Sequence, residues 1–553
     1  MKKENEENER KTVLSPDLLL QLYKLYQKKD PLPYSYIRIP GERSLNKRQH
    51  AKFFANCAIT CVARDVMKHS GIYEANENDT TNNWNCSWGF PFFIDDYKKF
   101  EPWQKINHFC GDFLLGKKSE LDYRMEELFP HYPELSNFYP LTFSLPRNQK
   151  EFKSAISSRR YWIFKPNHSD CGKYVQIYDT KKRLSSLHID FKEFKGVVQE
   201  YIDRPLTIFG RKFDLRIYVL VTSLRPLRIY MNTQGLARFC PKPYSLDNLD
   251  NGSHLTNFTL HKDDPDFVFS NNSRSENVNN CKWSLRFFLS FLSEQKKIDV
   301  SYIIKQIEKI IVTTLITAGT SIRICQESIT KHRKLCYELF GFDILIDEKF
   351  HCHLLEVNMK PNMSGLSSLL DYYMKYSVIL DMLRLANIID FDLDSSDEKK
   401  IKLKNDIENY EKKFAESISS ERRKAVELNE LNPWDDPVFA DFEIVRDLID
   451  ELVRKSSSSK KAASVPDYFD INDELKISKC KKTENDEDFK GTFSEEGHFR
   501  LIYPTPKNAD KYSSCFDVLR YEDIVLHKWM LMSEEEKLKI IQSHFNGCES
   551  KYY

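Results

Sequence analysis

The chain has 553 residues, 41% hydrophobic and 30% charged, which is enough for two to four domains with hydrophobic cores. Its 83 Lys and Arg residues nearly balance 82 Asp and Glu residues, which argues against a protein whose main task is to coat nucleic acid. We expect no secretory signal and no membrane span, because the N-terminus lacks an apolar stretch and no run of about 18 apolar residues occurs.

The cysteines indicate a reducing environment. There are 13 of them, an odd number without a secretory context, so we expect free thiols in the cytosol. Cys57 and Cys61 are the closest pair, but they lack the second pair of ligands that a zinc site requires. Their neighbours are apolar, and we expect both thiols to pack in a core.

The middle of the chain alternates short apolar runs with polar turns, as in an α/β (α+β) protein. These runs predict strands at 161–164, 175–178, 197–202, 216–221 and 227–231. Residues 283–318 have a helical period, and residues 367–385 form a second amphipathic pattern. Beyond residue 390 the composition becomes strongly charged, and the stretch 455–495 is mostly polar.

Two further runs predict a hairpin that carries acidic side chains. Phe340–Ile346 and Phe350–Val357 are strand-like and are separated by a short polar turn. On neighbouring strands, Asp343, Glu356 and Asn358 would lie side by side, because residues two apart share one face. Two carboxylates and one amide oxygen suit Mg²⁺, which commonly accompanies nucleotide phosphates. An ordinary strand end with polar residues explains these three positions equally well when they are taken alone.

Several segments upstream have polar residues where strands begin or end. Lys165 ends one strand and can direct an ammonium at phosphates, which the loop 167–174 would cover with backbone N–H groups. Gln199 to Ile202 follow an apolar strand and can offer backbone groups to an adenine edge. Lys212 to Arg216 place three charges on one strand face, a pattern that favours a polar site over simple alternation.

Two more polar positions follow. Arg238 is flanked by apolar residues, and such an arginine is often buried against a carboxylate of the protein or of a ligand. His254 and Asn257 belong to a polar cluster after a turn-rich stretch, in which Asn257 can serve a phosphate or a metal ion. A single histidine in this context is more often structural than catalytic.

Taken in order, these segments resemble one family. The motifs are 162–166, 199–202, 212–219, 221–223, 235–239, 254–257, 338–343 and 355–358. Together they resemble the tubulin tyrosine ligase-like family over about residues 100–390. Asn107-His108-Phe109 and the segment from Phe499 to Trp529 resemble its polyglutamylase branch, and within it the type 4 tubulin polyglutamylases.

The resemblance implies an ATP-grasp-type fold with N-terminal, central and C-terminal subdomains. It divides the chain into a flexible N-terminus (1–32), an N-terminal α/β region (33–150), a central ATP-grasp subdomain (151–205), a C-terminal ATP-grasp subdomain with the metal site (206–392), a charged helical extension (393–454), a disordered linker (455–495) and a C-terminal segment (496–553). The implied activity is ATP- and Mg²⁺-dependent ligation of free L-glutamate to glutamate side chains, through an acyl phosphate.

The same resemblance implies roles for individual residues. The catalytic residues are Lys165, Arg238 and Glu356. The ATP contacts are Lys165, Cys171, Gly172, Gln199, Glu200, Tyr201, Ile202, Lys212, Phe213, Asp214, Thr256 and Asn257. The incoming glutamate is held by Arg238, Thr259 and Lys282, and Mg²⁺ by Asp343, Glu356 and Asn358.

The implied partners are tubulin, microtubules or other acidic proteins, with no nucleic acid and no membrane. We expect a monomer in the cytoplasm and on the cytoskeleton, including the cilium or basal body.

Two departures from the family pattern leave alternatives open. Cys171 and Tyr174 stand where the family has an arginine and a second glycine in the phosphate loop, and Lys360 and Asn362 stand where it has serines. These changes favour, as an alternative, a weakly active or inactive microtubule-binding pseudoenzyme. A family ligase that uses glycine or tyrosine is another alternative, whereas a small-molecule ligase would not need the additional C-terminal regions.

Overall fold

The structure is a computed structural model. It describes residues 50–55, 59–75, 83–167, 174–181, 193–224, 227–257, 260, 280–330, 332, 334–365, 368–409, 412 and 498–503.

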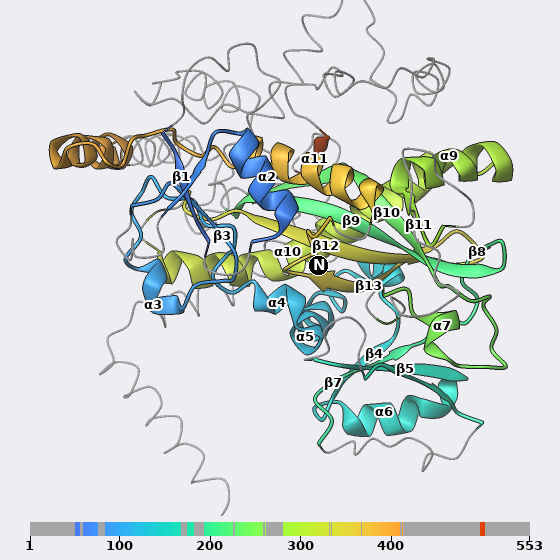
Figure 1. Ribbon diagram of the computed structural model, residues 1–553. Coiled ribbons are helices and arrows are strands. Elements are labelled where there is room, and N and C mark those ends of the chain that lie inside the picture. Colours follow the sequence, from blue (N-terminus) through green and yellow to red (C-terminus); the bar gives the residue numbers. More distant parts are fainter. Residues whose placement is uncertain are drawn as a thin grey trace, which may run out of the picture.

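A large antiparallel sheet forms the centre of the molecule (Figure 1). Its strands are β8 (Thr207–Ile208), β9 (Arg211–Leu224), β10 (Leu227–Phe239), β11 (Lys282–Ser284), β12 (Glu338–Ile346), β13 (Cys352–Asn358) and β14 (Phe499–Tyr503). The main order is β11-β10-β9-β12-β13, with β8 beside β9 and β14 beside β10. β12 and β13 are the hairpin that the sequence predicts, and Asp343 pairs with Glu356 in their register.

Helices cover both faces of this sheet. α9 (Leu285–Lys296) and α10 (Val300–Ile329) pack on one face, and α2 (Cys61–His69) and α11 (Leu369–Leu385) lie on the other (Figure 1). Strand alternation sorts the core, because successive residues of β9 point to opposite faces. Phe213, Leu215 and Ile217 belong to the cluster with α9 and α10, whereas Tyr218 and Leu220 belong to the cluster with α11.

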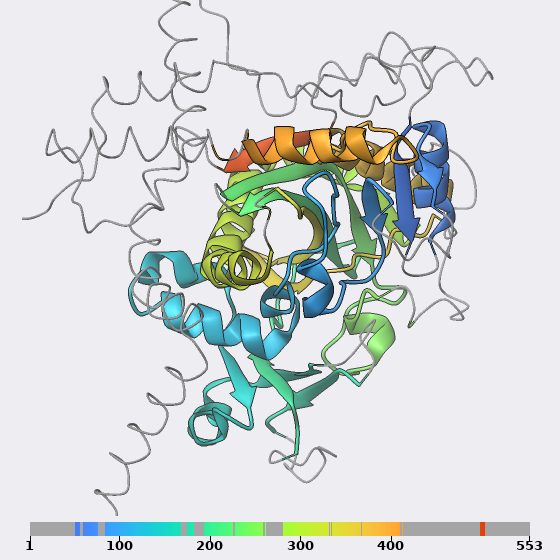
Figure 2. The same ribbon diagram turned by 90° about the vertical axis from the view of Figure 1, so that its left-hand side faces the viewer.

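A second, smaller sheet lies on the opposite side of the molecule from α11 (Figures 1 and 2). Its four antiparallel strands run in the order β4 (Thr142–Leu145), β7 (Gly196–Glu200), β5 (Tyr161–Pro166) and β6 (Gln176–Asp179). α6 (Gln149–Ala155) and the 3-10 turn η2 (Ile156–Ser158) accompany it, and Phe152 packs against Trp162 and Phe164. Two sheets that face one another across a nucleotide site are typical of the expected ATP-grasp architecture.

The N-terminal part wraps around the large sheet. It contains a small parallel sheet of β1 (Lys52–Ala55), β2 (Tyr73–Glu74) and β3 (Cys86–Trp88), followed by α3 (Ile94–Tyr97), α4 (Phe113–Gly116), α5 (Lys118–Leu128) and the 3-10 helix η1 (Pro133–Phe138). The short α7 (Asn251–His254) lies beside the lower end of β9. Residues 397–409 are helical and form the described part of the charged region.

Some sequence expectations are refined by the structure. The helical stretch 283–318 is two helices, because Lys297 has a left-handed φ of 56° after α9 and Asp299 caps α10 through the Ser301 N–H. Strands β9 and β10 are longer than predicted and form one hairpin. The prediction that Cys61 packs in a core is wrong, since its side chain is exposed at the start of α2, and Cys57 lies outside the described residues.

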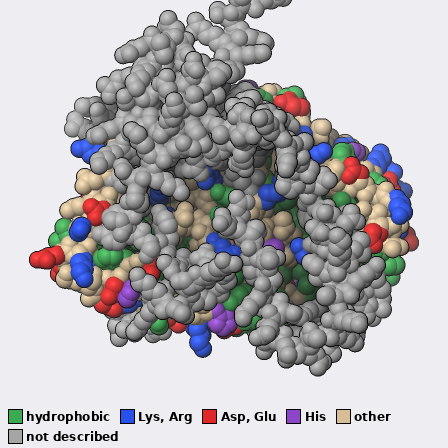
Figure 3. Space-filling view, turned by 90° about the horizontal axis from the view of Figure 1, so that it is seen from above, with side chains coloured by type: hydrophobic (Ala, Val, Ile, Leu, Met, Phe, Trp, Pro, Cys, Tyr) green, Lys and Arg blue, Asp and Glu red, His purple; other side chains and the backbone are tan. Residues whose placement is uncertain are grey.

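The C-terminal segment contributes a strand to the large sheet. β14 pairs with β10 from Ile229 to Asn232, and its Phe499, Ile502 and Tyr503 side chains are buried. The predicted domain division otherwise stays a prediction, and its flexible N-terminus and disordered linker lie outside the described residues. Among the helices that the structure describes, none has both the length and the apolar character needed to cross a bilayer. Acidic and basic side chains intermingle on the described part of the face in Figure 3.

Candidate functional site

A pocket that is open to solvent lies between the two sheets. Residues from both sheets and from the loops beside them line it: Lys118, Pro140, Ile163, Lys165, Val175, Gln199, Glu200, Tyr201, Ile202, Lys212, Asp214, His254, Leu255, Thr256, Asn257, Asp343, Leu345, Leu355 and Glu356. Of these 19 residues, nine were predicted as ATP contacts and two as metal ligands. The pocket therefore brings together segments that are up to about 240 positions apart in the sequence.

A row of charged side chains crosses the large sheet at this pocket. Neighbouring strands place Arg238 opposite both Asp214 and Lys282, and Asp343 opposite both Arg216 and Glu356. Each of the five strands β9 to β13 thus contributes at least one charged residue to the same region of the sheet. Paired positions on adjacent strands project their side chains to the same side, so this row follows from strand register.

Asp343 is the most heavily bonded carboxylate of the row. Arg216 donates to its two oxygens from Nε and Nη2 at 2.5 and 2.9 Å, and Arg238 Nη2 lies 2.8 Å from Oδ2. Burial by itself raises the pKa of Asp343, but the two guanidinium groups outweigh burial and hold this pKa well below its usual range. Asp343 is therefore ionised at neutral pH, as a metal ligand must be.

Arg238 is held by the protein's own carboxylates. Its Nε and Nη2 donate to Asp214 at 2.7 and 2.6 Å, and Thr256 Oγ1 donates to the same carboxylate at 2.6 Å. The Nη1 end of the guanidinium takes no part in these bonds. If Arg238 binds a substrate carboxylate as predicted, its Nη1 group would make the contact.

The predicted metal ligands lie together at the edge of the pocket. Asn358 Nδ2 is 3.4 Å from Asp343 Oδ2 and 3.3 Å from Glu356 Oε1, and Lys118 Nζ is 3.5 Å from Glu356 Oε2. Two carboxylates and an amide are hard oxygen donors, which fit Mg²⁺. The amide would have to turn its oxygen toward the ion, a rotation that exchanges two nearly identical groups.

Lys165 connects the small sheet to the large one. Its Nζ donates to Gln199 Oε1 at 2.6 Å and to the Leu355 carbonyl at 3.2 Å, and its side chain is buried. Burial lowers the pKa of Lys165 to about 8. Both hydrogen-bond partners are neutral, so this ammonium has an unmet preference for an anion such as a phosphate.

Lys212 heads a chain of hydrogen bonds on the other side of the pocket. Its Nζ donates to the Tyr201 hydroxyl at 2.9 Å, and that hydroxyl donates to His254 Nδ1 at 2.7 Å. His254 Nε2 lies 2.8 Å from the Asn248 carbonyl, which can only accept, so Nε2 carries the proton and the ring is neutral. Burial lowers the pKa of His254 and also lowers the pKa of Lys212, to about 8.

Two predicted ATP contacts are changed by the structure. Phe213 is a core residue, not a pocket residue, because strand alternation turns it away from Lys212 and Asp214 and packs it against Phe288. The backbone N–H groups of Glu200 and Tyr201 already donate to Leu141 and Tyr161, which anchors this segment in the small sheet. An adenine edge would therefore be met by other backbone groups of the segment.

The remaining predicted residues have different outcomes. Lys282 is the strand partner of Arg238 and therefore belongs to the charged row. Its ammonium forms an ion pair with Asp371 of α11, and Asp371 also pairs with Lys375. Cys171, Gly172 and Thr259 lie outside the described residues.

Tyr174, at the end of the predicted phosphate loop, has a left-handed backbone. Its φ is 63°, and its side chain is 77% exposed. Glycine adopts this conformation at no steric cost, whereas a residue with a Cβ is strained there by roughly 1–2 kcal/mol. A glycine, which the family pattern places at this position, would adopt the same backbone without this strain.

Several pocket residues escaped the sequence analysis. Lys118 reaches the pocket from α5, and Pro140, Ile163, Val175, Leu345 and Leu355 supply its apolar lining. The apolar residues carry no signal beyond strand character. Lys118 belongs to the pair Lys117-Lys118, and nothing local distinguishes it from a surface lysine.

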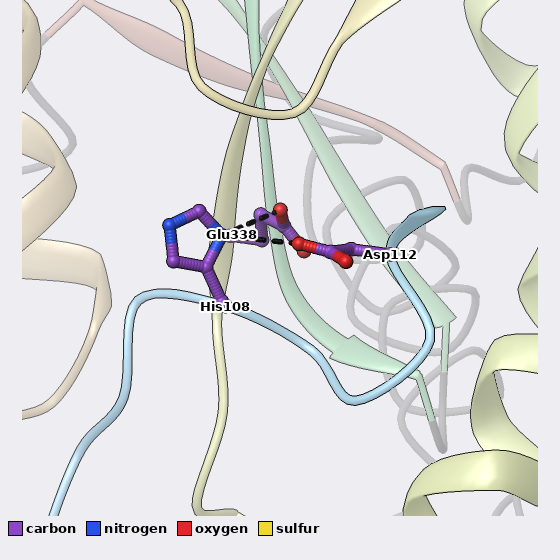
Figure 4. Close-up of side chains that lie close together, drawn as sticks. All are labelled: His108, Asp112 and Glu338. Carbon is purple, nitrogen blue, oxygen red and sulfur yellow. Dashed lines mark hydrogen bonds and ion pairs between the residues drawn. The ribbon is translucent and has the colours of Figure 1, made fainter. Parts of the chain in front are cut away.

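A second buried charge cluster lies outside the pocket and includes His108 (Figure 4). His108 Nδ1 is 2.9 Å from Glu338 Oε1 and 3.2 Å from Asp112 Oδ2, and its Nε2 lies 2.8 Å from the Gly89 carbonyl. Burial lowers the pKa of His108, but the two carboxylates outweigh burial and raise this pKa to about 10. An imidazolium ion has one N–H for Glu338 Oε1 and one for the Gly89 carbonyl, whereas Asp112 Oδ2 is only paired with the charge and has no hydrogen-bond partner among the described residues.

The comparisons with known proteins agree with this geometry. The model of the tubulin-tyrosine ligase family matches residues 97–395, just over half of the chain. The chain belongs to this family. The matched range begins before the His108 cluster and ends after α11, so it includes every described residue of the pocket.

Individual relatives are about 30% identical. The chain is 32% identical to tubulin polyglutamylase TTLL5 of Mus musculus over 360 residues, 63% of this chain and 26% of that protein. It is 32% identical to tubulin monoglutamylase TTLL4 of Homo sapiens over 334 residues, 59% of this chain and 27% of that protein. It is 28% identical to tubulin polyglutamylase ttll-4 of Caenorhabditis briggsae over 471 residues, 84% of this chain and 70% of that protein. The match spans only about a quarter of the two mammalian relatives.

Proposed function

We propose that this chain is an ATP- and Mg²⁺-dependent ligase that joins free glutamate to the γ-carboxylate of glutamate side chains in tubulin tails or other acidic proteins. In this reaction the acceptor carboxylate takes the terminal phosphoryl group of ATP, and the amine of glutamate then displaces phosphate to form an amide. The observation that carries the proposal is the pairing, in one pocket, of two buried lysines with an acidic strand pair. Phosphoryl transfer depends mainly on positioning and on neutralising charge, which such a set supplies.

The roles of the residues follow from their contacts. Lys165 and Lys212 hold buried ammonium groups whose hydrogen-bond partners are neutral, so they would bind phosphate oxygens. Asp343, Glu356 and Asn358 would hold Mg²⁺, which supplies charge neutralisation at the transferred phosphoryl group. The Nη1 end of Arg238, with Lys282 on the adjacent strand, would bind a carboxylate of the incoming glutamate.

Relatives with similar sequences support the choice of tubulin and glutamate. Two of the mammalian proteins named above are a tubulin polyglutamylase and a tubulin monoglutamylase. A cytoplasmic and cytoskeletal location, including the cilium, accompanies this proposal as a prediction. An acceptor carboxylate on an acidic tail would enter the pocket, whose lining includes the basic side chains of Lys118 and Lys165.

The decisive experiment is mass spectrometry of tubulin incubated with the purified full chain, ATP, Mg²⁺ and glutamate. We expect added glutamate masses with the wild type and a loss of about 100-fold or more with Glu356→Gln, because removing one group that stabilises transition-state charge typically costs that much. The matched control is Glu348→Gln on the turn of the same hairpin, which faces Arg204 on the surface and should retain activity. Equal activity of Glu356→Gln and wild type would contradict the metal role.

The donor is tested in the same assay. Glycine and tyrosine are supplied in place of glutamate, since each would add a different mass. Arg238→Met should reduce use of glutamate while a fluorescent ATP analogue still binds. If glycine or tyrosine is transferred at a higher rate than glutamate, the donor in the proposal is wrong.

A weakly active or inactive microtubule-binding protein is a second candidate, and the strained backbone of Tyr174 favours it. A Cβ and a ring at this position would also limit how closely the loop backbone approaches a phosphate, which would weaken ATP binding. Direct ATP titration separates the two candidates. Absence of ATP binding together with retained microtubule co-sedimentation would support the second one.

A further inference from the structure

Two cysteines that are 215 positions apart lie in contact on the α10 side of the large sheet. Cys110 precedes α4 and is buried, whereas Cys325 lies near the end of α10 and is partly exposed. Their sulfur atoms are 3.8 Å apart. This contact is about 1.8 Å longer than the roughly 2.05 Å of a disulfide, so the two sulfur atoms must move toward one another for the bond to form.

The backbones are also close at this point, as Gly111 shows. Gly111 has a φ of 100°, and a Cβ placed on it would lie 3.2 Å from Cys325 Cβ and 3.7 Å from the Cα of Ile322. The segment after His108 thus lies directly on α10, with no room for a side chain between them. A disulfide needs Cα atoms about 4.4–6.8 Å apart, and such close packing is the arrangement that allows it.

The two thiols differ in their environment. Cys325 is the more exposed, and the hydrogen bond from the Cys110 thiol lowers the pKa of Cys325. The same contact and burial raise the pKa of Cys110, and the nearby Asp112 carboxylate opposes ionisation of both. The thiolate, the reactive form, therefore forms more readily on Cys325, which is also the more exposed of the two thiols.

We propose that Cys110 and Cys325 are a redox modification site that forms an intramolecular disulfide with hydrogen peroxide as the oxidant. The Cys325 thiolate attacks one peroxide oxygen, the O–O bond breaks, and the released hydroxide takes a proton to become water. The Cys110 sulfur then attacks the sulfenic sulfur of Cys325, and hydroxide leaves with the Cys110 proton as a second water. Two thiols and one peroxide thus give one disulfide and two waters, and a dithiol such as dithiothreitol reverses the modification.

The bond would connect two elements that serve different parts of the molecule. The segment from Cys110 leads through α4 to Lys118 at the pocket, and α10 supports the core of the large sheet. Cross-linking residues so far apart in sequence restricts the unfolded chain more than the folded one. The oxidised protein should therefore resist unfolding more than the reduced protein. This inference does not depend on the proposed function.

The test uses the full chain and peptide mapping. The reduced protein is treated with an equivalent of hydrogen peroxide, remaining thiols are alkylated, and the protein is digested with trypsin without reduction. The sequence places three neighbouring cysteines on three different peptides: Cys110 on 106–117, Cys325 on 324–331 and Cys336 on 335–349. We expect the first two peptides joined, with a mass two hydrogens below their sum, and separated again by dithiothreitol.

Matched variants identify the reacting thiols. Cys325→Ala should abolish the cross-link, and Cys110→Ala should leave a sulfenic acid on Cys325 that dimedone traps. Cys336→Ala is the control and should retain the cross-link, because Cys336 is buried and burial raises its pKa. Joining of 106–117 to 335–349, or alkylation of Cys325 in peroxide-treated wild type to the extent seen before treatment, would overturn the proposal.

Urea denaturation supplies a second readout. Oxidation should raise the midpoint of unfolding in the wild type, and dithiothreitol should return it. In Cys325→Ala the midpoint should not respond to peroxide. A midpoint that rises equally in this variant would assign the effect to another oxidised residue and would overturn the proposal.

Discussion

β12 carries a buried charge cluster on each of its two faces, and the clusters differ in what they leave unsatisfied. Glu338 and Asp343 are five positions apart, so they point to opposite faces of the sheet. Around Glu338, one imidazolium ion forms ion pairs with two carboxylates and donates to the Gly89 carbonyl. Around Asp343, the cluster continues into a pocket where two buried lysines donate, among the described residues, to neutral oxygen atoms.

This difference separates a structural charge cluster from a functional one. Burying charges costs free energy, and ion pairs within the His108 cluster offset part of this cost: they raise the pKa of His108, although burial still holds the pKa of Glu338 well above its ordinary value. In the pocket, burial lowers the pKa of Lys165 and of Lys212, and their hydrogen-bond partners among the described residues carry no charge that would offset it. A site that keeps buried cations without bonded anions is prepared for an anionic ligand. The two faces therefore respond to different perturbations.

Removing the imidazole should have the largest effect on stability. His108→Ala leaves the Asp112 and Glu338 carboxylates buried without their cation, which costs about 3–5 kcal/mol of the free energy of unfolding. Urea denaturation measures this loss. His353→Ala is the matched control, because His353 pairs with Asp347 near the turn of the hairpin and should cost under about 1 kcal/mol. A similar small cost for His108→Ala would contradict the structural role.

The pocket should respond to pH through Lys212. Its pKa in the folded protein is about 8, below its ordinary value near 10.5, so the unfolded chain binds more protons between these values. The contribution of Lys212 to the free energy of unfolding of the ligand-free protein should therefore rise as pH increases through that window. ATP affinity should fall over the same range, because the ammonium charge is lost. Titration calorimetry should show that ATP binds roughly tenfold more weakly at pH 9 than at pH 7. This change corresponds to the loss of about one charge-assisted hydrogen bond.

Lys212→Met provides the control for this pH effect. The variant should bind ATP more weakly at pH 7, and its affinity should still fall between pH 7 and pH 9, because the pKa of Lys165 is also about 8, but the fall should be smaller than in the wild type. A variant with the wild-type pH profile would assign the titration to a different group.

The smallest effect is expected at Tyr174. Tyr174→Gly removes the strain of a φ of 63° but also increases the conformational freedom of the unfolded chain. The net change in the free energy of unfolding should therefore be about 1 kcal/mol or less. We expect ATP to bind a few-fold more tightly, measured by the same calorimetry. Phe209→Gly is the matched control, since Phe209 also has a positive φ, of 51°, but lies outside the pocket lining. Equal gains in both variants would indicate a general effect rather than one on the phosphate loop.

Local patterns were sufficient for a large part of the fold and of the site. The hairpin that carries Asp343 and Glu356, the strand that ends at Lys165 and the charged face of 212–216 could each be predicted, because strand alternation and turn residues act over a few positions. The resemblance to a known family then ordered these pieces into one site. Phe213 shows the limit of transferring a whole motif, since alternation turns it into the core.

What the sequence by itself determined was therefore the set of strands, their polar faces and the chemistry of their side chains. Tertiary structure alone decided which distant groups meet: Lys118 beside Glu356, His108 between Asp112 and Glu338, and Cys110 against Cys325. The physical reason is that alternation along a strand has a period of two residues, whereas contacts between elements depend on how the whole chain closes around its cores.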